Sequence, residues 1–165
     1  MSKKILYIDL DGVIADFDGA IKKWCPDLET GDNFPNYQDR FNKVNEICEA
    51  NPDIFHRLDT IEDGIDSVRE LMPHFDVYFL STPMDNVPES FTGKKVWIDR
   101  HFGELASKRL ILTHRKDLAM GDYIVDDRTR NGVDKFIGIH IHFGTEQFPN
   151  WKVTKAFLLS LVHQL

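Results

Sequence analysis

Four aspartates stand in two tight pairs, and each pair lies where a short apolar run ends. Asp9 ends the run KILYID with Asp11 just beyond it, and Asp126 and Asp127 follow DYIV. Two carboxylates about 4 Å apart repel by roughly 4 kcal/mol at an effective dielectric constant of 20, so such a group needs a cation or raised pKa values. With no Cys or His in the pattern, hard oxygen ligands select Mg²⁺ over zinc or copper. Magnesium in turn indicates a phosphate substrate.

Hydroxyl groups and a lysine accompany the aspartates. Ser81 and Thr82 follow the run DVYFL, and Lys116 lies between two later apolar runs. A serine can donate hydrogen bonds to a phosphoryl oxygen, and a lysine can neutralise the charge that develops there. An acidic pair alone is often a helix cap with a solvated charge, but the combination favours a phosphate site. Gly12 would permit close approach of the backbone to phosphate or metal.

These residues must be positioned by a sheet. Five apolar runs of strand length alternate with helical patterns, which is typical of a parallel sheet built from right-handed crossovers. The runs are nearly continuously apolar, so we expect helices on both faces and a three-layer, Rossmann-like α/β fold. Ligands bind at the carboxyl ends of such strands. The predicted strands are Lys4–Asp9, Asp76–Leu80, Arg109–Leu112, Asp122–Val125 and Phe136–Ile141.

One connection is longer than a simple crossover. From Phe17 to Thr60 the chain runs through roughly 40 residues, more than a usual strand-to-helix link. An amphipathic pattern that includes Phe41 and Val44 predicts a helix within it. We therefore predict an α/β core of residues 1–17 and 60–165 with a small helical cap at 18–59, inserted after the first strand. Asp16 is expected to have a structural role, as the cap of the insertion's first helix.

The segment DLDGVIADF, from Asp9 to Phe17, resembles the first signature of the haloacid dehalogenase superfamily of aspartate-based phosphatases. The other signatures follow in order, as FLSTP, LTHRKD and YIVDDR. DGVIADF, the STP turn and the LTHRK and VDDR segments are similar to the 5′(3′)-deoxyribonucleotidase family. The resemblance covers nearly the whole chain and implies the haloacid dehalogenase-like fold.

The resemblance also implies catalytic roles. Asp9 would be the nucleophile that forms an aspartyl-phosphate, and Asp11 the general acid that protonates the leaving oxygen and then activates water. Ser81 and Lys116 would hold the phosphoryl oxygens. These roles agree with the chemistry of the side chains, because a second carboxyl two residues from the nucleophile can reach the leaving group.

The same resemblance implies the metal ligands. They would be the Asp9 carboxylate, the Asp11 backbone carbonyl and a carboxylate of the second pair. We match the last ligand to Asp127, with Asp126 orienting Lys116 or a metal-bound water, although the sequence leaves open which of the two aspartates binds the metal directly.

The predicted substrate contacts come partly from the cap. Phe17 falls on a position that stacks on the nucleobase in the family, and Phe55 is a second candidate. Thr82 is a candidate for the sugar or base. Lys94 aligns with a family lysine that meets phosphate, and a solvated helix lysine is the open alternative. The predicted cap is shorter than that of the animal members, so the preferred base is left open.

The predicted function is a Mg²⁺-dependent phosphomonoesterase acting on deoxyribonucleoside monophosphates. Three alternatives stay open. The first is a phosphatase of another small phosphomonoester or of a nucleic-acid 3′ phosphate. The second is a phosphoacceptor signalling domain, although such domains lack a long insertion after the first strand. The third is a scaffold that binds metal without catalysis.

Composition limits the partners. The chain has 165 residues with 20 basic and 27 acidic side chains, a formal charge of −7, and no basic stripe, so no stable complex with nucleic acid is expected. No apolar run approaches the roughly 20 residues that span a bilayer, and the N-terminus does not read as a signal peptide. We expect a cytoplasmic protein with a small-molecule substrate. A homodimer is left open.

Cysteines and histidines give no competing metal site. Cys25 and Cys48 lack a CxxC partner and are expected to be reduced thiols. His140 and His142 share one face of a predicted strand, and no third ligand lies nearby in the sequence. Polar residues on a strand near the sheet edge are the favoured interpretation of this pair.

Overall fold

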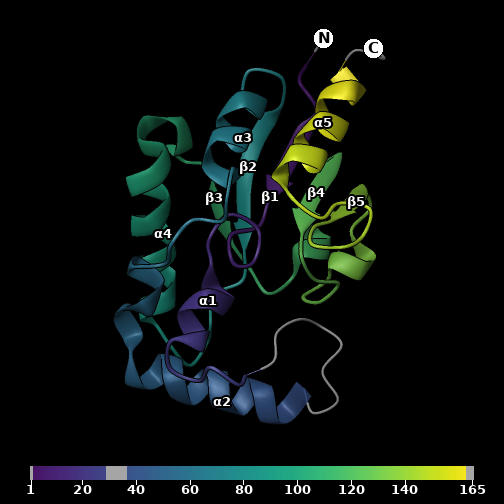
Figure 1. Cartoon of the computed structure of the whole chain (residues 1–165). Coiled ribbons are helices and arrows are strands. Elements are labelled where there is room, and N and C mark those ends of the chain that lie inside the picture. Colours follow the sequence, from purple (N-terminus) through teal and green to yellow (C-terminus); the bar gives the residue numbers. More distant parts are fainter. Residues whose placement is uncertain (1, 29–36, 163–165) are drawn as a thin grey trace.

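The computed structural model describes residues 2–28 and 37–162. A five-stranded sheet in the order β3-β2-β1-β4-β5 lies at its centre, and every strand pairing is parallel (Figure 1). The predicted α/β fold class is confirmed. The strands are β1 (Ile5–Ile8), β2 (Asp76–Ser81), β3 (Leu110–Leu112), β4 (Tyr123–Asp126) and β5 (Ile139–His142).

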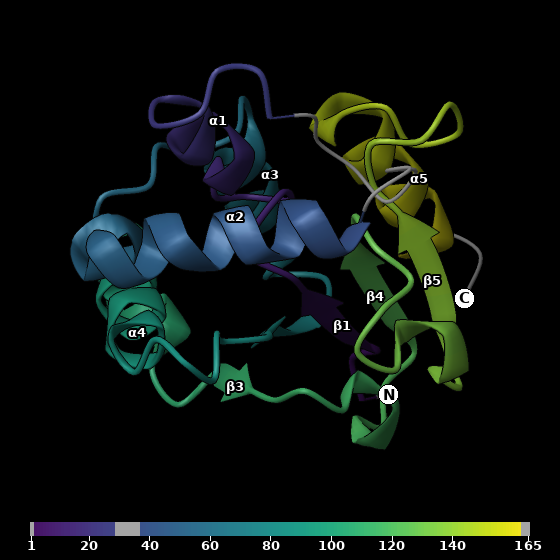
Figure 2. The same cartoon turned by 90° about the horizontal axis from the view of Figure 1, so that it is seen from below.

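Long helices pack on one face of the sheet. Leu6 and Ile8 of β1 belong to the larger apolar cluster, together with residues of all three core helices such as Val68, Trp97 and Leu158. Figure 2 shows α3 and α5 together on this side. The helices are α3 (Gly64–Leu71), α4 (Glu89–Phe102), which continues into η2 (Gly103–Ala106), and α5 (Trp151–Val162).

The opposite face is covered by short turns rather than by long helices. Tyr7 and Ile124 alternate with the residues of the first face and pack with Val133 and Phe136 in a second cluster. The connections on either side of β4 are short, so this third layer consists of the 3₁₀ helices η3 (Lys116–Leu118) and η4 (Val133–Lys135). β5 starts later than predicted because η4 leads directly into Phe136, whose backbone N–H donates to Val133 at 3.1 Å.

The chain between β1 and α3 lies across the carboxyl end of the sheet. It contains α1 (Phe17–Lys22), α2 (Tyr37–Ala50) and η1 (Pro52–His56), and Figures 1 and 2 show α2 beneath the strand ends. The two connections to the core run side by side, since Asp16 N–H donates to Asp59 O at 2.8 Å. We call residues 18–59 the cap segment. Residues 29–36 of it lie outside the described ranges, and its status as a separate domain stays a prediction.

The cap segment begins as the sequence indicates. The Asp16 carboxylate accepts a hydrogen bond of 2.9 Å from the Gly19 N–H at the start of α1. The predicted structural role of Asp16 is confirmed. Over residues 2–28 and 37–162, the model holds no helix with the length and apolarity needed to cross a bilayer.

Candidate active site

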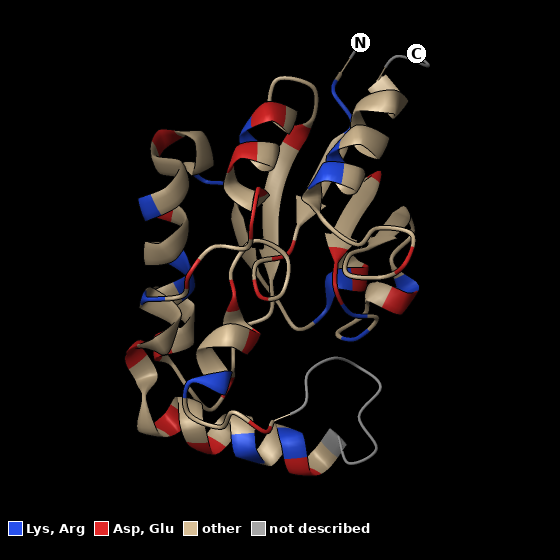
Figure 3. Ribbon diagram, in the orientation of Figure 1, with Lys and Arg blue, Asp and Glu red and all other residues tan. Residues whose placement is uncertain are grey.

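The polar strand ends meet at one edge of the sheet. Asp9 directly follows β1, Ser81 ends β2 and Asp126 ends β4. Because β1 lies between β2 and β4, these three positions are neighbours. The Asp9 N–H donates to Val125 O at 3.0 Å, which ties the two acidic strand ends together. Acidic and basic segments gather at this end of the sheet, facing α2 (Figure 3).

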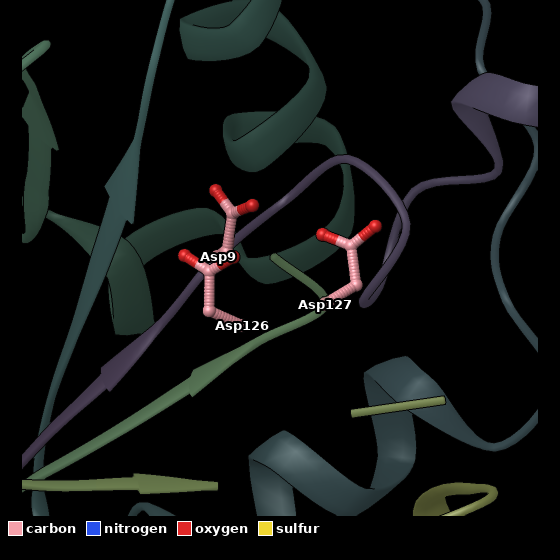
Figure 4. Close-up of side chains that lie close together, drawn as sticks. All are labelled: Asp9, Asp126 and Asp127. Carbon is pink, nitrogen blue, oxygen red and sulfur yellow. The ribbon is translucent and has the colours of Figure 1, made fainter. Parts of the chain in front are cut away.

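Three carboxylates form the centre of the site. Asp9, Asp126 and Asp127 each offer an oxygen, and these oxygens lie within 4.8 Å of one another (Figure 4). Burial, and then the charge of Asp9, raise the pKa of Asp126 to about 7. Burial also raises the pKa of Asp127 well above its ordinary value, although Arg128 opposes this. The cluster therefore carries more negative charge than its surroundings compensate.

Lys116 supplies one compensating charge. Its ammonium is buried, 2.6 Å from an Asp126 oxygen and 3.0 Å from an Asp9 oxygen. Burial works to lower the pKa of Lys116, but the two carboxylates outweigh it and hold the pKa above its ordinary value. The backbone of η3 fixes this lysine, because the Lys116 N–H donates to Asn131 O at 2.7 Å. A permanent positive charge thus lies beside Asp9.

The remaining oxygens fit a hard cation. In the described ranges, Oδ1 of Asp11 and Oδ1 of Asp127 are buried and accept no hydrogen bond. Leaving a buried polar atom unpaired costs about 1–3 kcal/mol, so such atoms call for a partner. Gly12 leaves room for this arrangement, since a Cβ there would lie 2.7 Å from the Asp127 carboxyl carbon. Carboxylate and carbonyl oxygens are the ligands of Mg²⁺.

A cavity of about 400 Å³ opens between these groups and the cap segment. This volume suits a small-molecule ligand. Its lining is polar at the strand ends and partly aromatic on the side of the cap segment. Among the residues that line it are Asp9, Asp11, Ser81, Lys116, Asp126, Phe17 and Phe55.

Residues 3–155 match the model of the family described as 5′ nucleotidase, deoxy (Pyrimidine), cytosolic type C protein. The chain belongs to this family. It is therefore a phosphomonoester hydrolase of the deoxyribonucleotidase type, as the sequence predicted.

Relatives from phage and bacteria carry the name 5′(3′)-deoxyribonucleotidase. The protein of Vibrio phage KVP40 is 40% identical over 162 residues, which cover 96% of this chain and 86% of the phage protein. That of Bordetella bronchiseptica is 32% identical over 137 residues, 75% of this chain and 74% of the relative. A protein of Staphylococcus aureus is 28% identical over an alignment of 182 residues, which covers 99% of this chain and 100% of the relative.

Solved structures support the fold. A haloacid dehalogenase-like family hydrolase of Xanthomonas campestris has a TM-score of 0.60 at 11% identity, covering 99% of this chain and 97% of its own. The hydrolase YfnB of Bacillus subtilis, solved bound to magnesium, has a TM-score of 0.54 at 11% identity, with coverages of 96% and 100%. The chain thus has the haloacid dehalogenase-like fold that the motifs indicated.

The two predicted hydroxyl groups, of Ser81 and Thr82, have different surroundings in this deoxyribonucleotidase. Ser81 is buried, and its Oγ has no hydrogen-bond partner in the described part of the chain. The Thr82 hydroxyl donates to Thr113 O at 2.9 Å. Both residues line the cavity. Ser81 is therefore free to meet a ligand oxygen, whereas Thr82 already holds the loop that follows β3.

Lys94 lies buried between Asp11 and the Phe55 ring. This α4 side chain is 1% exposed, and its ammonium contacts the Asp11 carboxylate. It also lies 5.3 Å from the centroid of the Phe55 ring. The alternative of a solvated helix lysine is wrong, because α4 packs on η1 and buries the side chain. Contact of Lys94 with phosphate stays a prediction.

The two predicted aromatic residues lie together. The rings of Phe17 and Phe55 stack with centroids 5.5 Å apart and an interplanar angle of 15°. Both line the cavity, with Phe17 directly before the cap segment and Phe55 near its end. Phe17 is 7% and Phe55 only 1% exposed, and the Lys94 ammonium also faces the Phe55 ring, so Phe17 is the more open of the two. Contact of either ring with a nucleobase stays a prediction.

Sequence reasoning missed several residues of the cavity wall. On α2, the face that includes Arg40 and Asn45 meets the cavity, and the spacing of four residues from these to Val44 and Phe41, respectively, was the available signal. Arg40 is buried and pairs with Asp18 at 2.8 Å, joining α2 to α1. Asn45 Oδ1 is buried without a hydrogen-bond partner among the described residues. The other missed lining residues include Met84, Asn86, His114, Arg128 and Arg130.

Proposed function

We propose that this chain is a Mg²⁺-dependent phosphomonoesterase that hydrolyses deoxyribonucleoside monophosphates through an aspartyl-phosphate. One observation carries the proposal. Asp9 lies on the floor of the cavity, beside two further carboxylates and a buried lysine, in a chain of the deoxyribonucleotidase family. The deoxy and pyrimidine terms in the family's description support the substrate class.

Asp9, Asp127 and the Asp11 backbone carbonyl would hold Mg²⁺. The unpaired oxygen of Asp127 and the space at Gly12 support this assignment, as does the magnesium of the Bacillus subtilis hydrolase of similar fold. Asp126 instead accepts a hydrogen bond from Lys116, which favours a positioning role for it. When bound, Mg²⁺ polarises a phosphoryl oxygen and reduces the repulsion between phosphate and carboxylates.

Asp9 would act as the nucleophile. Its carboxylate oxygen forms a bond to phosphorus while the bond to the sugar oxygen breaks in line. Asp11 donates a proton to that leaving oxygen from its carboxyl group, and the nucleoside departs. The Asp11 carboxylate then accepts a proton from water, which attacks phosphorus and releases inorganic phosphate and Asp9.

Two further groups would bind the phosphoryl oxygens. Lys116 faces Asp9 with a charge that its surroundings preserve, so it can stabilise the negative charge of the transition state. Ser81 can donate its hydroxyl, which has no other partner in the described ranges. Neither group needs to move far, since both already line the cavity.

The cap segment would contact the nucleoside. Phe17, directly before this segment, lines the cavity and would meet the base, with the buried Phe55 stacked against it as support. We assign Asn45 to the edge of the base, because an amide can both donate and accept hydrogen bonds and its Oδ1 is unpaired in the described structure. A cytoplasmic location follows the cytosolic type in the family's description.

A panel of phosphate esters with and without Mg²⁺ tests this function. Deoxyuridine monophosphate should be turned over in the presence of Mg²⁺, and excess chelator should abolish the activity. Faster turnover of a 3′-phosphorylated oligonucleotide or of a non-nucleotide ester would show that deoxyribonucleoside monophosphates are not the preferred substrates. A stable phosphoryl-protein without turnover would instead indicate a phosphoacceptor domain.

A further inference from the structure

Two histidines of β5 contact the backbone of the metal-site aspartates. His140 Nε2 lies 3.0 Å from Asp126 O, and His142 Nε2 lies 3.0 Å from Asp127 O. Their rings stack, with centroids 4.9 Å apart and an interplanar angle of 26°. Alternate residues of a strand share a face, so one edge strand delivers both contacts.

The chemistry of these contacts fixes the hydrogen position. A carbonyl oxygen can only accept, so each Nε2 must carry hydrogen, whether its ring is neutral or charged. Asp126 O also accepts the Phe143 N–H at 3.0 Å. The sheet register ends at Asp126 and His142. Asp127 therefore lies one residue past the last strand pair, where the His142 ring contacts its carbonyl oxygen.

A fixed peptide plane restricts the direction in which an aspartate projects its carboxylate. Asp127 needs such restraint, because its buried Oδ1 has no hydrogen-bond partner in the described residues and its Oδ2 only meets Arg128 at 3.5 Å. Outer contacts that orient metal ligands contribute strongly to affinity, and their loss commonly costs tenfold or more.

We propose that His140 and His142 are positioning residues that clamp the Asp126 and Asp127 carbonyls and so hold the Asp127 carboxylate ready for the cation. The pair acts through the backbone, and neither ring belongs to the described group of side chains that could hold the ion, which consists of Asp9, Asp126 and Asp127. This inference rests on the proposed metal site, which Mg²⁺ binding by the unmodified protein tests separately.

Calorimetric titration of the full chain with Mg²⁺ tests the clamp without any activity readout. His142→Ala should weaken Mg²⁺ binding by about tenfold, and His140→Ala by less, because Asp126 keeps the Phe143 donor. His142→Gln should restore most of the affinity, because its amide can donate as Nε2–H does. His74→Ala is the matched control, an exposed histidine that should leave binding unchanged. The melting temperature of each metal-free variant separates positioning from loss of fold.

If the variants are unstable, nitrogen NMR of ¹⁵N-histidine in the unmodified protein tests the clamp without any substitution. Both rings should show a hydrogen on Nε2 that exchanges slowly with water. A bare Nε2 on His142 overturns the clamp, and so do alanine variants that bind Mg²⁺ normally or a glutamine variant no better than alanine. No Mg²⁺ binding by the unmodified protein would overturn the metal site, and the clamp with it.

Discussion

Asp9 and Asp11 are two residues apart and share a loop, yet their neighbours give them different tasks. Asp9 lies against the buried Lys116 ammonium and the Asp126–Asp127 pair. Asp11 contacts Lys94 through one oxygen and keeps the other unpaired within the described structure. We therefore expect their substitutions to have different effects on the reaction.

Asp9→Asn removes the proposed nucleophile while keeping the shape of the side chain. We expect kcat for deoxyuridine monophosphate to fall by on the order of a thousandfold or more, which is about 4 kcal/mol of activation free energy. The metal-free melting temperature should hold or rise, because one charge of a repelling cluster is lost. Asp66→Asn, an exposed change on α3, is the control. Retention of more than about a tenth of the activity would contradict covalent catalysis by Asp9.

Asp11→Asn should discriminate between leaving groups. A nucleoside oxygen needs a proton to depart, so we expect kcat on deoxyuridine monophosphate to fall by about a hundredfold or more. An aryl phosphate with an acidic phenol needs little protonation and should lose much less. The measurement is the ratio of the two rates in variant and wild type. An equal loss on both substrates argues against Asp11 as the acid.

Three residues of the site were predicted because each one lies at the end of a strand. Residues at strand ends are brought together by sheet order alone, so Asp9, Ser81 and Asp126 could be placed before any coordinates. Lys94 could not, since its contact with Asp11 depends on how α4 packs against η1. The His140 and His142 contacts depend on side-chain reach across β4 and also escaped prediction.

At the scale of elements, α2 is the part of the cap segment that closes over the cavity. Its apolar spacing predicted a helix, and α2 confirms it. Which polar residues would face the cavity was not predicted, because the buried Arg40–Asp18 pair that joins α2 to α1 is a tertiary contact. The strands, in contrast, were predicted within a few residues. The central strands β1, β2 and β4 are largely buried apolar runs, and the more exposed edge strands β3 and β5 still carry apolar residues between turns.

Asn45→Ala tests the assigned task of α2. We expect kcat/KM for deoxyuridine monophosphate to fall about fivefold, the equivalent of one hydrogen bond of about 1 kcal/mol. Deoxyribose 5-phosphate, which has no base, should be hydrolysed by variant and wild type alike. Asn42→Ala on the exposed side of the same helix is the control. If the variant loses activity equally on the substrate without a base, Asn45 supports the fold of the cap rather than the base.

At the scale of the whole molecule, the buried acidic cluster links stability to pH and metal. The folded chain raises the pKa of Asp126 from 3.8 to about 7 and that of Asp127 in the same direction. Between these pH values the folded state binds more protons than the unfolded state. Without metal, this pair therefore makes the free energy of unfolding fall as pH rises from about 4 to about 7.

We expect metal-free protein to melt at a higher temperature at about pH 5 than at about pH 8, with a smaller difference in Asp126→Asn. Mg²⁺ should raise the melting temperature mainly at the higher pH, where the carboxylates are charged. At a hundred times its dissociation constant, the ion would add about 2.7 kcal/mol. Thermal melts with chelator and with Mg²⁺ provide the comparison. A melting temperature that changes neither with pH nor with Mg²⁺ would contradict the buried cation site.

Trapping the covalent intermediate tests the central claim most directly. The enzyme, Mg²⁺ and deoxyuridine monophosphate with a labelled phosphate are mixed, quenched in acid within one turnover, digested and analysed by mass spectrometry. The label should lie on the peptide that carries Asp9, borohydride should convert that residue to homoserine, and Asp9→Asn should carry no label. Release of deoxyuridine with no label on the chain, or with label on another residue, would contradict the account.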